Sequence, residues 1–162
     1  MSVQTTYRHA ATKGIAGGIY DAYHYPVDTR HNEEPNGVLR CGVGVVQGTE
    51  PGSDIKLPTA GATAATFEGV VVNGFTNMHD LEGKVFVMSG QSVGVMRRGR
   101  IWVHVADDAE PAYGDALHML VEGEQAGFFA TEGGVTIPGR FIGGAADGLA
   151  PVELDGITAN ED

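Results

Sequence analysis

Residues 84–108 show the most regular alternation of apolar and polar positions in the chain. Three short runs rich in β-branched and aromatic residues follow one another, separated by Gly90 and by the basic group of residues 97–100. In the third run one face carries Ile101, Val103 and Val105, and the other carries Trp102 and His104. A period of two with glycine punctuation is typical of half-buried antiparallel strands. The segment therefore predicts a three-stranded β-meander with a basic turn.

Short strands of the same kind recur along the rest of the chain. Turn signals separate them at the spacing of about 8–12 residues that is typical of β-sandwiches and barrels. Further strands are predicted at residues 38–46, 55–57, 68–75, 116–121, 128–131, 135–138, 140–145 and 149–154. In the first of these, one face carries Leu39, Cys41, Val43 and Val45. Helix is limited to one or two turns near residues 76–80. The predicted fold class is all-β, a compact antiparallel β-barrel or sandwich with an extended N-terminal arm.

Residues 1–37 have no clean period and are predicted to form that arm. Pro26 blocks a helix here, yet the segment holds too many rings for a simple disordered tail. We therefore expect the arm to become ordered by lying against its own body or against a neighbour. An Asn-Gly turn signal at residues 36–37 marks the start of the compact body, residues 38–154. Residues 155–162 form a short acidic tail.

Composition narrows the classes of partner. The chain has 162 residues, of which 25 are Gly, and 21 acidic residues against 10 basic ones give a net charge of −11. Such a body repels nucleic acid backbones and anionic membranes, so neither is expected as a partner. The acidic excess fits a solubilising surface, or else a complementary basic partner.

Cysteine content and hydropathy indicate the cellular compartment in which the protein is made. The single Cys41 excludes an internal disulfide and is compatible with synthesis in a reducing cytoplasm. No apolar run approaches the roughly 18 residues of a membrane span, and the first residues lack the pattern of a secretory signal.

Residues 90–94 (GQSVG) match the G-x-S-x-G motif of serine hydrolases, and Asp115 and His118 follow in the order of a catalytic triad. The motif needs a helix directly after the nucleophile, here Ser92, to aim backbone N–H groups at the oxyanion. The β alternation instead continues through Val93. A chance match in a glycine-rich hairpin is favoured, so no catalytic residue is assigned, and a Ser92-based hydrolase is kept as the less favoured alternative.

The six histidines raise the question of a metal site. The densest group of potential ligands comprises His104, Asp107, Asp108 and His118. None of the histidine spacings typical of zinc sites is present, and one cysteine cannot form a structural zinc site. We therefore expect neither a metal nor another cofactor, and we interpret His104 as a surface or interface residue.

A basic cluster stands out within the acidic body. It comprises Arg97, Arg98 and Arg100, followed by Trp102. Three arginines are too few for a nucleic-acid-binding face. They suit pairing with carboxylates of an identical neighbour or of another partner. The alternative is a solvated hairpin tip whose ion pairs contribute little to stability.

Four stretches together resemble a known family. They are MSVQTTYRHAATKGIAGGIYDA at the start, GVVVNGF at 69–75, VGVMRRGRIWVHVADDAEPAYGDALHM at 93–119 with its Gly-Asp corner, and RFIGGAADGLAPVEL at 140–154. The chain is similar to the capsid decoration, or structural cement, proteins of tailed phages.

The resemblance implies a non-enzymatic virion protein that is made in the host cytoplasm. It would bind the outer surface of an icosahedral head as a homotrimer and bridge adjacent major capsid proteins. An extended peptide with aromatic anchors suits addition to a sheet edge of the shell. The expected capsid-binding residues are Tyr20, Tyr23, His24 and Tyr25. The alternative within the same class is a β-rich tail or spike component.

Overall fold

The structure, a computed structural model of the chain, describes residues 14–21, 26–74 and 77–156. Within these ranges it consists of strands and one short 3₁₀ helix, so the predicted all-β class is confirmed. The elements are β1 (Val27–Asn32), β2 (Gly44–Gln47), β3 (Asp54–Lys56), η1 (Ala64–Thr66), β4 (Phe67–Val71), β5 (Asn77–His79), β6 (Val85–Val87), β7 (Ser92–Met96), β8 (Arg98–His104), β9 (Ala116–Met119), β10 (Phe129–Ala130), β11 (Val135–Phe141) and β12 (Leu149–Asp155). No helix in the described part is long and apolar enough to cross a bilayer.

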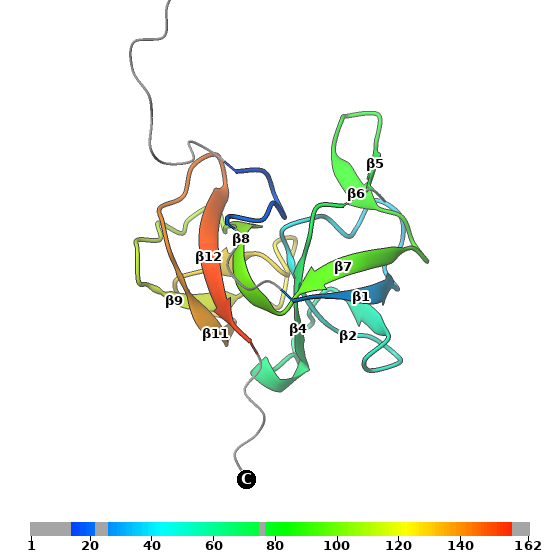
Figure 1. Cartoon of the computed structure of the whole chain (residues 1–162), viewed down its shortest axis with the longest axis horizontal. Helices are drawn as coiled ribbons and strands as arrows, with labels where there is room; N and C mark the ends of the chain where they lie inside the picture. Colours follow the sequence, from blue (N-terminus) through cyan, green and yellow to red (C-terminus); the bar gives the residue numbers. More distant parts are fainter. Residues whose placement is uncertain (1–13, 22–25, 75–76, 157–162) are drawn as a thin grey trace, which may run out of the picture.

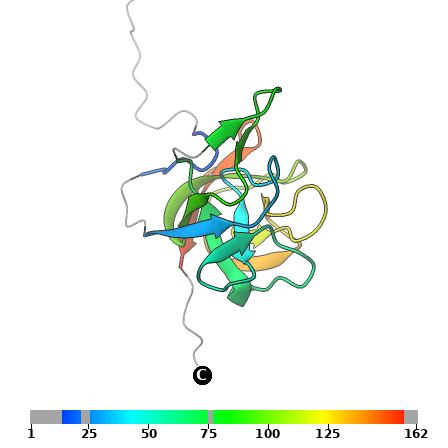
Figure 2. The ribbon, with the colours of Figure 1, turned by 90° about the vertical axis from the view of Figure 1, so that its right-hand side faces the viewer.

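The strands form a closed barrel, a five-stranded sheet and a separate hairpin. The barrel has the order β1-β3-β2-β4-β7, and the sheet has the order β10-β9-β11-β12-β8. Barrel and sheet lie side by side, and the β5–β6 hairpin projects from the barrel side of the molecule (Figure 1). The same projection is visible after a quarter turn (Figure 2). All strand pairs are antiparallel except β1 with β3.

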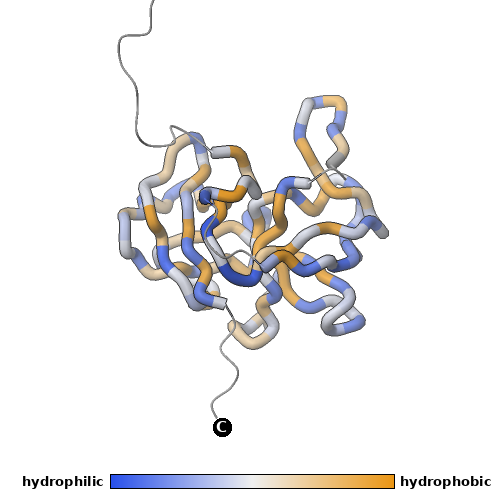
Figure 3. Tube along the Cα trace, viewed as in Figure 1, coloured by the Kyte–Doolittle hydropathy of each residue, from blue (hydrophilic) through white to orange (hydrophobic). Residues whose placement is uncertain are grey.

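Two clusters of buried apolar side chains form the core. The larger joins the sheet to one side of the barrel, with Phe129 and Phe141 from the sheet and Phe67 and Met96 from the barrel. The smaller fills the barrel around Ile55 and neighbouring side chains. Hydrophobic residues accordingly recur along the strands of both parts (Figure 3). Burying such side chains supplies the main favourable term of folding.

The alternation predicted for β8 is confirmed. Ile101, Val103 and Val105 are buried, whereas Trp102 and His104 on the other face are half-buried. The predicted burial of the apolar face at residues 39–45 is also confirmed. Regular strand begins there only at Gly44, however, because the preceding backbone turns sharply.

The predicted β-meander is wrong. The runs that were expected to pair with one another are β6, β7 and β8, and each pairs elsewhere: β6 with β5, β7 with β1 and β4, and β8 with β12. The chain passes from barrel to sheet between β7 and β8. The basic turn is also shorter than expected, because Arg97 alone separates these two strands. Alternation shows which face of a strand is buried, but it does not identify the neighbouring strand.

Two further expectations need correction. The helical turn expected near residues 76–80 is instead strand β5, which pairs with β6. The segment 135–145 holds one strand, β11, with a β-bulge between Ile137 and Arg140, where two strands were expected. In addition, β1 lies within residues 1–37, the range predicted as an arm, and it is part of the closed barrel.

Gly69 of β4 provides a test of the barrel's close packing. Its φ is 142°, and a Cβ atom at this position would overlap the carbonyl group of Met96. Gly69→Ala is expected to lower the free energy of unfolding by about 3 kcal/mol. Gly52 is the matched control, since it has φ 86° and nothing within 4 Å of an added Cβ. Gly52→Ala should lower the free energy of unfolding by only about 1 kcal/mol, the cost of holding alanine at a positive φ. Urea unfolding of both variants measures the difference, and equal losses would contradict this account of Gly69.

Candidate functional site

Residues 14–21, here called the strap, lie along the outer edge of β8. Three backbone hydrogen bonds of 2.9 Å join the two segments. The N–H of Gly17 donates to the carbonyl oxygen of Trp102, the N–H of Trp102 donates to the carbonyl oxygen of Gly18, and the N–H of Tyr20 donates to the carbonyl oxygen of Arg100. Because β8 is the last strand in the sheet order, the strap covers an edge whose backbone groups would otherwise lack partners. This part of the chain is therefore ordered against its own body, one of the two outcomes expected for the arm.

The strap also contacts the barrel. Asn73, two residues after β4, donates its backbone N–H to the Gly17 carbonyl at 2.9 Å. Gly17 has φ 73°, and a Cβ there would lie 2.7 Å from both Asn73 N and the Val71 carbonyl oxygen. A Cβ at Gly42 would lie 2.8 Å from Gly17 N. Glycine is thus required where the strap passes between the sheet and the barrel.

Two of the aromatic residues singled out from the sequence, Tyr20 of the strap and Trp102 of β8, contact each other. The rings of Tyr20 and Trp102 have centroids 5.7 Å apart and are tilted by 46°. At the start of the strap, a Cβ on Gly14 would overlap the Trp102 indole. Trp102 is therefore half-buried within its own chain, while Tyr20 keeps 37% of its surface exposed.

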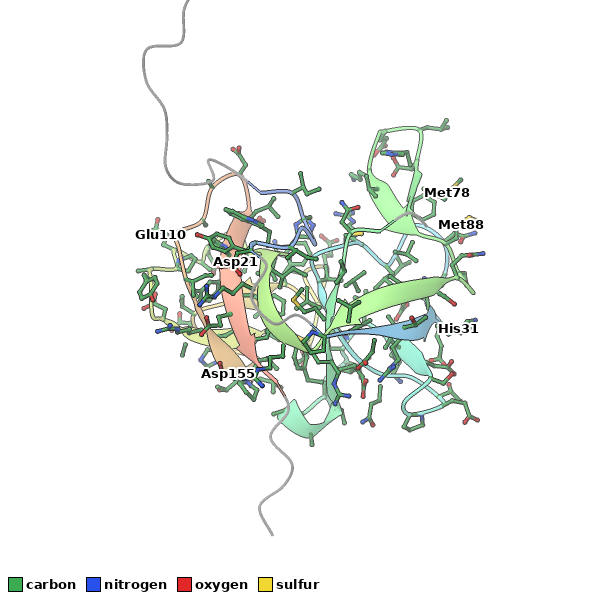
Figure 4. All side chains as sticks on the ribbon, viewed as in Figure 1. Asp21, His31, Met78, Met88, Glu110 and Asp155 are labelled. Atoms are coloured by element: carbon green, nitrogen blue, oxygen red, sulfur yellow. The ribbon has the colours of Figure 1, made fainter. Side chains whose placement is uncertain are left out.

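An ion-pair network fixes the end of the strap. Arg100 Nη1 lies 2.7 Å from Asp21 Oδ2 of the strap, and its Nε lies 2.7 Å from Glu153 Oε2 of β12. Arg140 adds a longer contact to Glu153, at 3.5 Å. The hydrogen bonds to Glu153 and Asp21 raise the pKa of Arg100 above its usual range. Figure 4 places Asp21 over this region of the sheet. Arg100 thus links the strap to two strands.

The other two arginines of the predicted interface cluster differ from each other. Arg97 Nη1 lies 3.4 Å from Asp28 of β1, a partly exposed pair that contributes little to stability. Arg98 is exposed and forms no ion pair among the residues that the structure describes. Of the cluster, Arg98 is thus the arginine whose charge stays available to a partner. Tyr23, His24 and Tyr25, the other predicted capsid-binding residues, lie outside the described residues.

The hydrolase motif does not form a nucleophile elbow. Ser92 begins β7, which continues as a strand to Met96, and it pairs with His31 of β1. The helix that should follow the nucleophile is replaced by strand.

The two histidines considered as metal ligands, His104 and His118, are engaged elsewhere. The His104 ring stacks on Phe128, with centroids 5.0 Å apart and planes 14° apart. Burial, and secondarily the nearby Arg40, lowers the pKa of His104 below 6.5. His118 Nδ1 lies 2.9 Å from the Gly133 carbonyl oxygen. Within the described ranges, no group of three or more potential ligands converges on one point.

The comparisons with known proteins agree with this architecture. The family model described as "Structural cement protein (E217 gp24/Pam3 gp6)" matches residues 3–155. The chain belongs to this family of phage proteins. A solved chain from the capsid of Myoviridae phage XM1 has the same fold, with a TM-score of 0.70 at 18% identity over 98% of this chain and 100% of that one. A search of the curated proteins finds no match. The protein is therefore a structural cement protein of a phage.

Sequence reasoning missed one surface feature of this cement protein. Leu81, at the tip of the β5–β6 hairpin, is fully exposed, and Met78 on the same hairpin is 46% exposed (Figure 4). A cavity of about 370 Å³ lies beside the turn of the hairpin and is lined by Arg40, Lys84 and His104 among others. The sequence signal was an apolar residue in the turn at residues 80–83, flanked by two carboxylates.

The Arg100 network should hold the strap in place. Arg100→Ala removes both 2.7 Å contacts, so the amide protons of Gly17 and Tyr20 should exchange with solvent several-fold faster. Arg98→Ala is the matched control, because Arg98 lies on the same strand without an ion pair in the described ranges. Hydrogen exchange read out by NMR checks this. Equal exchange rates in both variants would show that the strap's backbone hydrogen bonds suffice.

The lowered pKa of His104 makes stability depend on pH. Below pH 6.5 the unfolded chain binds a proton at this ring more readily than the folded chain, so the contribution is complete above pH 6.5 and is lost as the pH falls through the folded-state pKa. His104→Phe keeps a ring against Phe128 and removes the titration. Between pH 7.5 and 5.5 the wild type should lose more unfolding free energy than the variant, by at most about 1.4 kcal/mol per pH unit. Parallel pH profiles of denaturant unfolding would contradict the assignment.

Proposed function

We propose that this cement protein binds the outer surface of an icosahedral phage head as a homotrimer and bridges adjacent major capsid proteins. The observation that carries the proposal is the match of the structural cement family to nearly the whole chain, residues 3–155. The full-length fold similarity to a chain of a myovirus capsid supports it.

The physical effect of such a protein follows from mass action. A protein that contacts two subunits across a seam binds only where both subunits are in their assembled positions. It therefore adds free energy to the assembled lattice and none to the separated subunits. When several binding segments belong to one trimer, their weak contacts reinforce one another through effective concentration.

The residues proposed to contact the shell are Tyr20 together with Tyr23, His24 and Tyr25, which follow it in the sequence, and Arg98. Tyr20 lies one residue before the end of the strap and has 37% of its surface exposed. Aromatic residues are frequent energetic anchors of protein interfaces. Arg98 offers an exposed cation to carboxylates of the shell or of a neighbouring copy.

The proposal is tested with heads assembled from the cognate major capsid protein and lacking the cement protein. The wild type should co-sediment with expanded heads and raise the temperature at which they break. Substitution of Tyr23, His24 and Tyr25 together by Ala should weaken binding about tenfold or more, with an unchanged melting temperature of the free protein.

Val38→Ala is the control for that experiment, since Val38 is an apolar residue with 40% exposure outside the strap and outside residues 22–25. This variant should bind heads like the wild type. Wild-type protein that fails to bind heads would overturn the proposed function. Unchanged binding of the triple variant would instead overturn only the assignment of these rings. Sedimentation equilibrium of the free protein measures the proposed trimer.

A further inference from the structure

Arg140 belongs to a row of charged side chains that crosses three neighbouring strands of the sheet (Figure 1). It lies opposite Glu153 of β12, which lies opposite Arg100 of β8. Arg100 uses its Nε and Nη1 atoms in two contacts of 2.7 Å, whereas Arg140 makes one contact of 3.5 Å through Nε. Among the described residues, the two Nη atoms of Arg140 make no hydrogen bond or ion pair. One edge of this guanidinium therefore keeps its donors available to a partner.

The backbone and a neighbouring ring hold Arg140 in this position. The β-bulge between Ile137 and Arg140 includes Gly139, whose φ is 152° and where a Cβ would overlap the carbonyl group of Glu153. Such bulges change the direction of side chains and are frequent beside functional sites. Arg140 Cζ lies 5.2 Å from the centroid of the Tyr113 ring, a cation–π distance. Because the guanidinium is held before a partner arrives, less conformational entropy is lost on binding.

Tyr113 belongs to a turn that is bonded to the end of β11. Asp115 Oδ2 accepts a hydrogen bond from the backbone N–H of Ala112 at 2.8 Å, which closes the turn. The N–H of Gly114 donates to the carbonyl oxygen of Phe141 at 2.8 Å, and the N–H of Phe141 donates to the carbonyl oxygen of Asp115 at 2.9 Å. Tyr113 is nevertheless 68% exposed. An aromatic residue that is fixed by its backbone and left exposed is suited to contact a partner.

A hollow of about 150 Å³ lies beside Arg140, and its other lining residues include Tyr20, Tyr113 and Ile142. This volume is below the roughly 300 Å³ at which pockets for small molecules begin, so the hollow suits a single side chain. Tyr20 and Tyr113 are the two tyrosines in the described part of the chain, and both are exposed. Tyrosine and arginine are enriched in protein interfaces. A guanidinium flanked by two rings and an aliphatic side chain fits a carboxylate on a short apolar stem.

We propose that this hollow binds an aspartate or glutamate side chain of the major capsid protein. Arg140 donates N–H groups of both Nη atoms to the carboxylate, and Tyr20 and Tyr113 cover its stem. Bidentate pairing with arginine is stronger and more directional than contact with a point charge. The sign of the charge separates this hollow from the cavity of about 640 Å³ near β9 and β10, where Asp108 and Glu132 would repel a carboxylate. The inference rests on the proposed binding to the shell and names the chemistry of one contact.

Substitutions of Arg140 test the contact by co-sedimentation with expanded heads that lack the cement protein. Arg140→Ala should weaken binding about tenfold. Arg140→Lys should recover little of that loss, because an ammonium group keeps the charge but lacks the planar fork that pairs with both carboxylate oxygens. Tyr113→Ala should weaken binding several-fold, since the ring positions the guanidinium. Binding of the wild type should also fall more steeply with added salt than binding of Arg140→Ala.

Lys56→Ala is the matched control, since it removes a cation from β3 of the barrel, and it should bind heads like the wild type. The melting temperatures of the free variants should stay close to that of the wild type, because the ion pair of Arg140 with Glu153 is long and partly exposed.

The outcomes separate this contact from the proposed function. Heads that bind the wild type and Arg140→Ala equally well would overturn the contact and leave the proposed function standing. Full recovery in Arg140→Lys would overturn the bidentate carboxylate. A changed sedimentation equilibrium of free Arg140→Ala with unchanged head binding would assign the hollow to a carboxylate of a second copy and overturn the shell as its occupant. Wild-type protein that fails to bind heads would overturn both proposals.

Discussion

The structure depends on closing the free edge of β8. That strand ends the five-stranded sheet, and an uncovered edge would leave a row of backbone donors and acceptors open to any extended peptide. The strap satisfies these groups at Trp102 and Arg100 and at the same time bonds to Asn73 beside the barrel. One short segment therefore caps the sheet and ties it to the barrel. The glycines at positions 17 and 42 make the close approach possible, since a Cβ at either would collide with backbone.

Local pattern predicted much of the secondary structure but little of the pairing. The period of two correctly identified the buried face of β8, because burial of alternate residues is a property of one strand and its surroundings. It could not show that β7 belongs to the barrel while β8 belongs to the sheet, because pairing depends on distant segments. β5 was taken for a helical turn for the same reason, since its strand conformation comes from pairing with β6. The all-β class survived these errors because each misplaced segment is still a short strand or turn.

The candidate site shows the same limit in its electrostatics. The sequence shows the arginine cluster, and we interpreted it as one surface, yet its members have different roles in the fold. Arg100 pairs with carboxylates that lie 79 and 53 residues away, which no local pattern could connect to it. Arg97 pairs with Asp28 of β1 in a partly exposed contact, and Arg98 remains exposed. In a chain with a net charge of −11, using a cation internally removes it from the few that can attract an acidic partner.

Some arginines of this cement protein pair within the chain and others stay exposed, and this difference affects how it can contact neighbouring proteins. Copies with a net charge of −11 repel one another when a shell brings them close, and the repulsion is strongest where carboxylates face carboxylates. A cation that remains exposed, or an apolar side chain that projects, offsets this repulsion locally. Arg98 and Leu81 are such side chains, whereas Arg100 pairs within the chain and holds the strap.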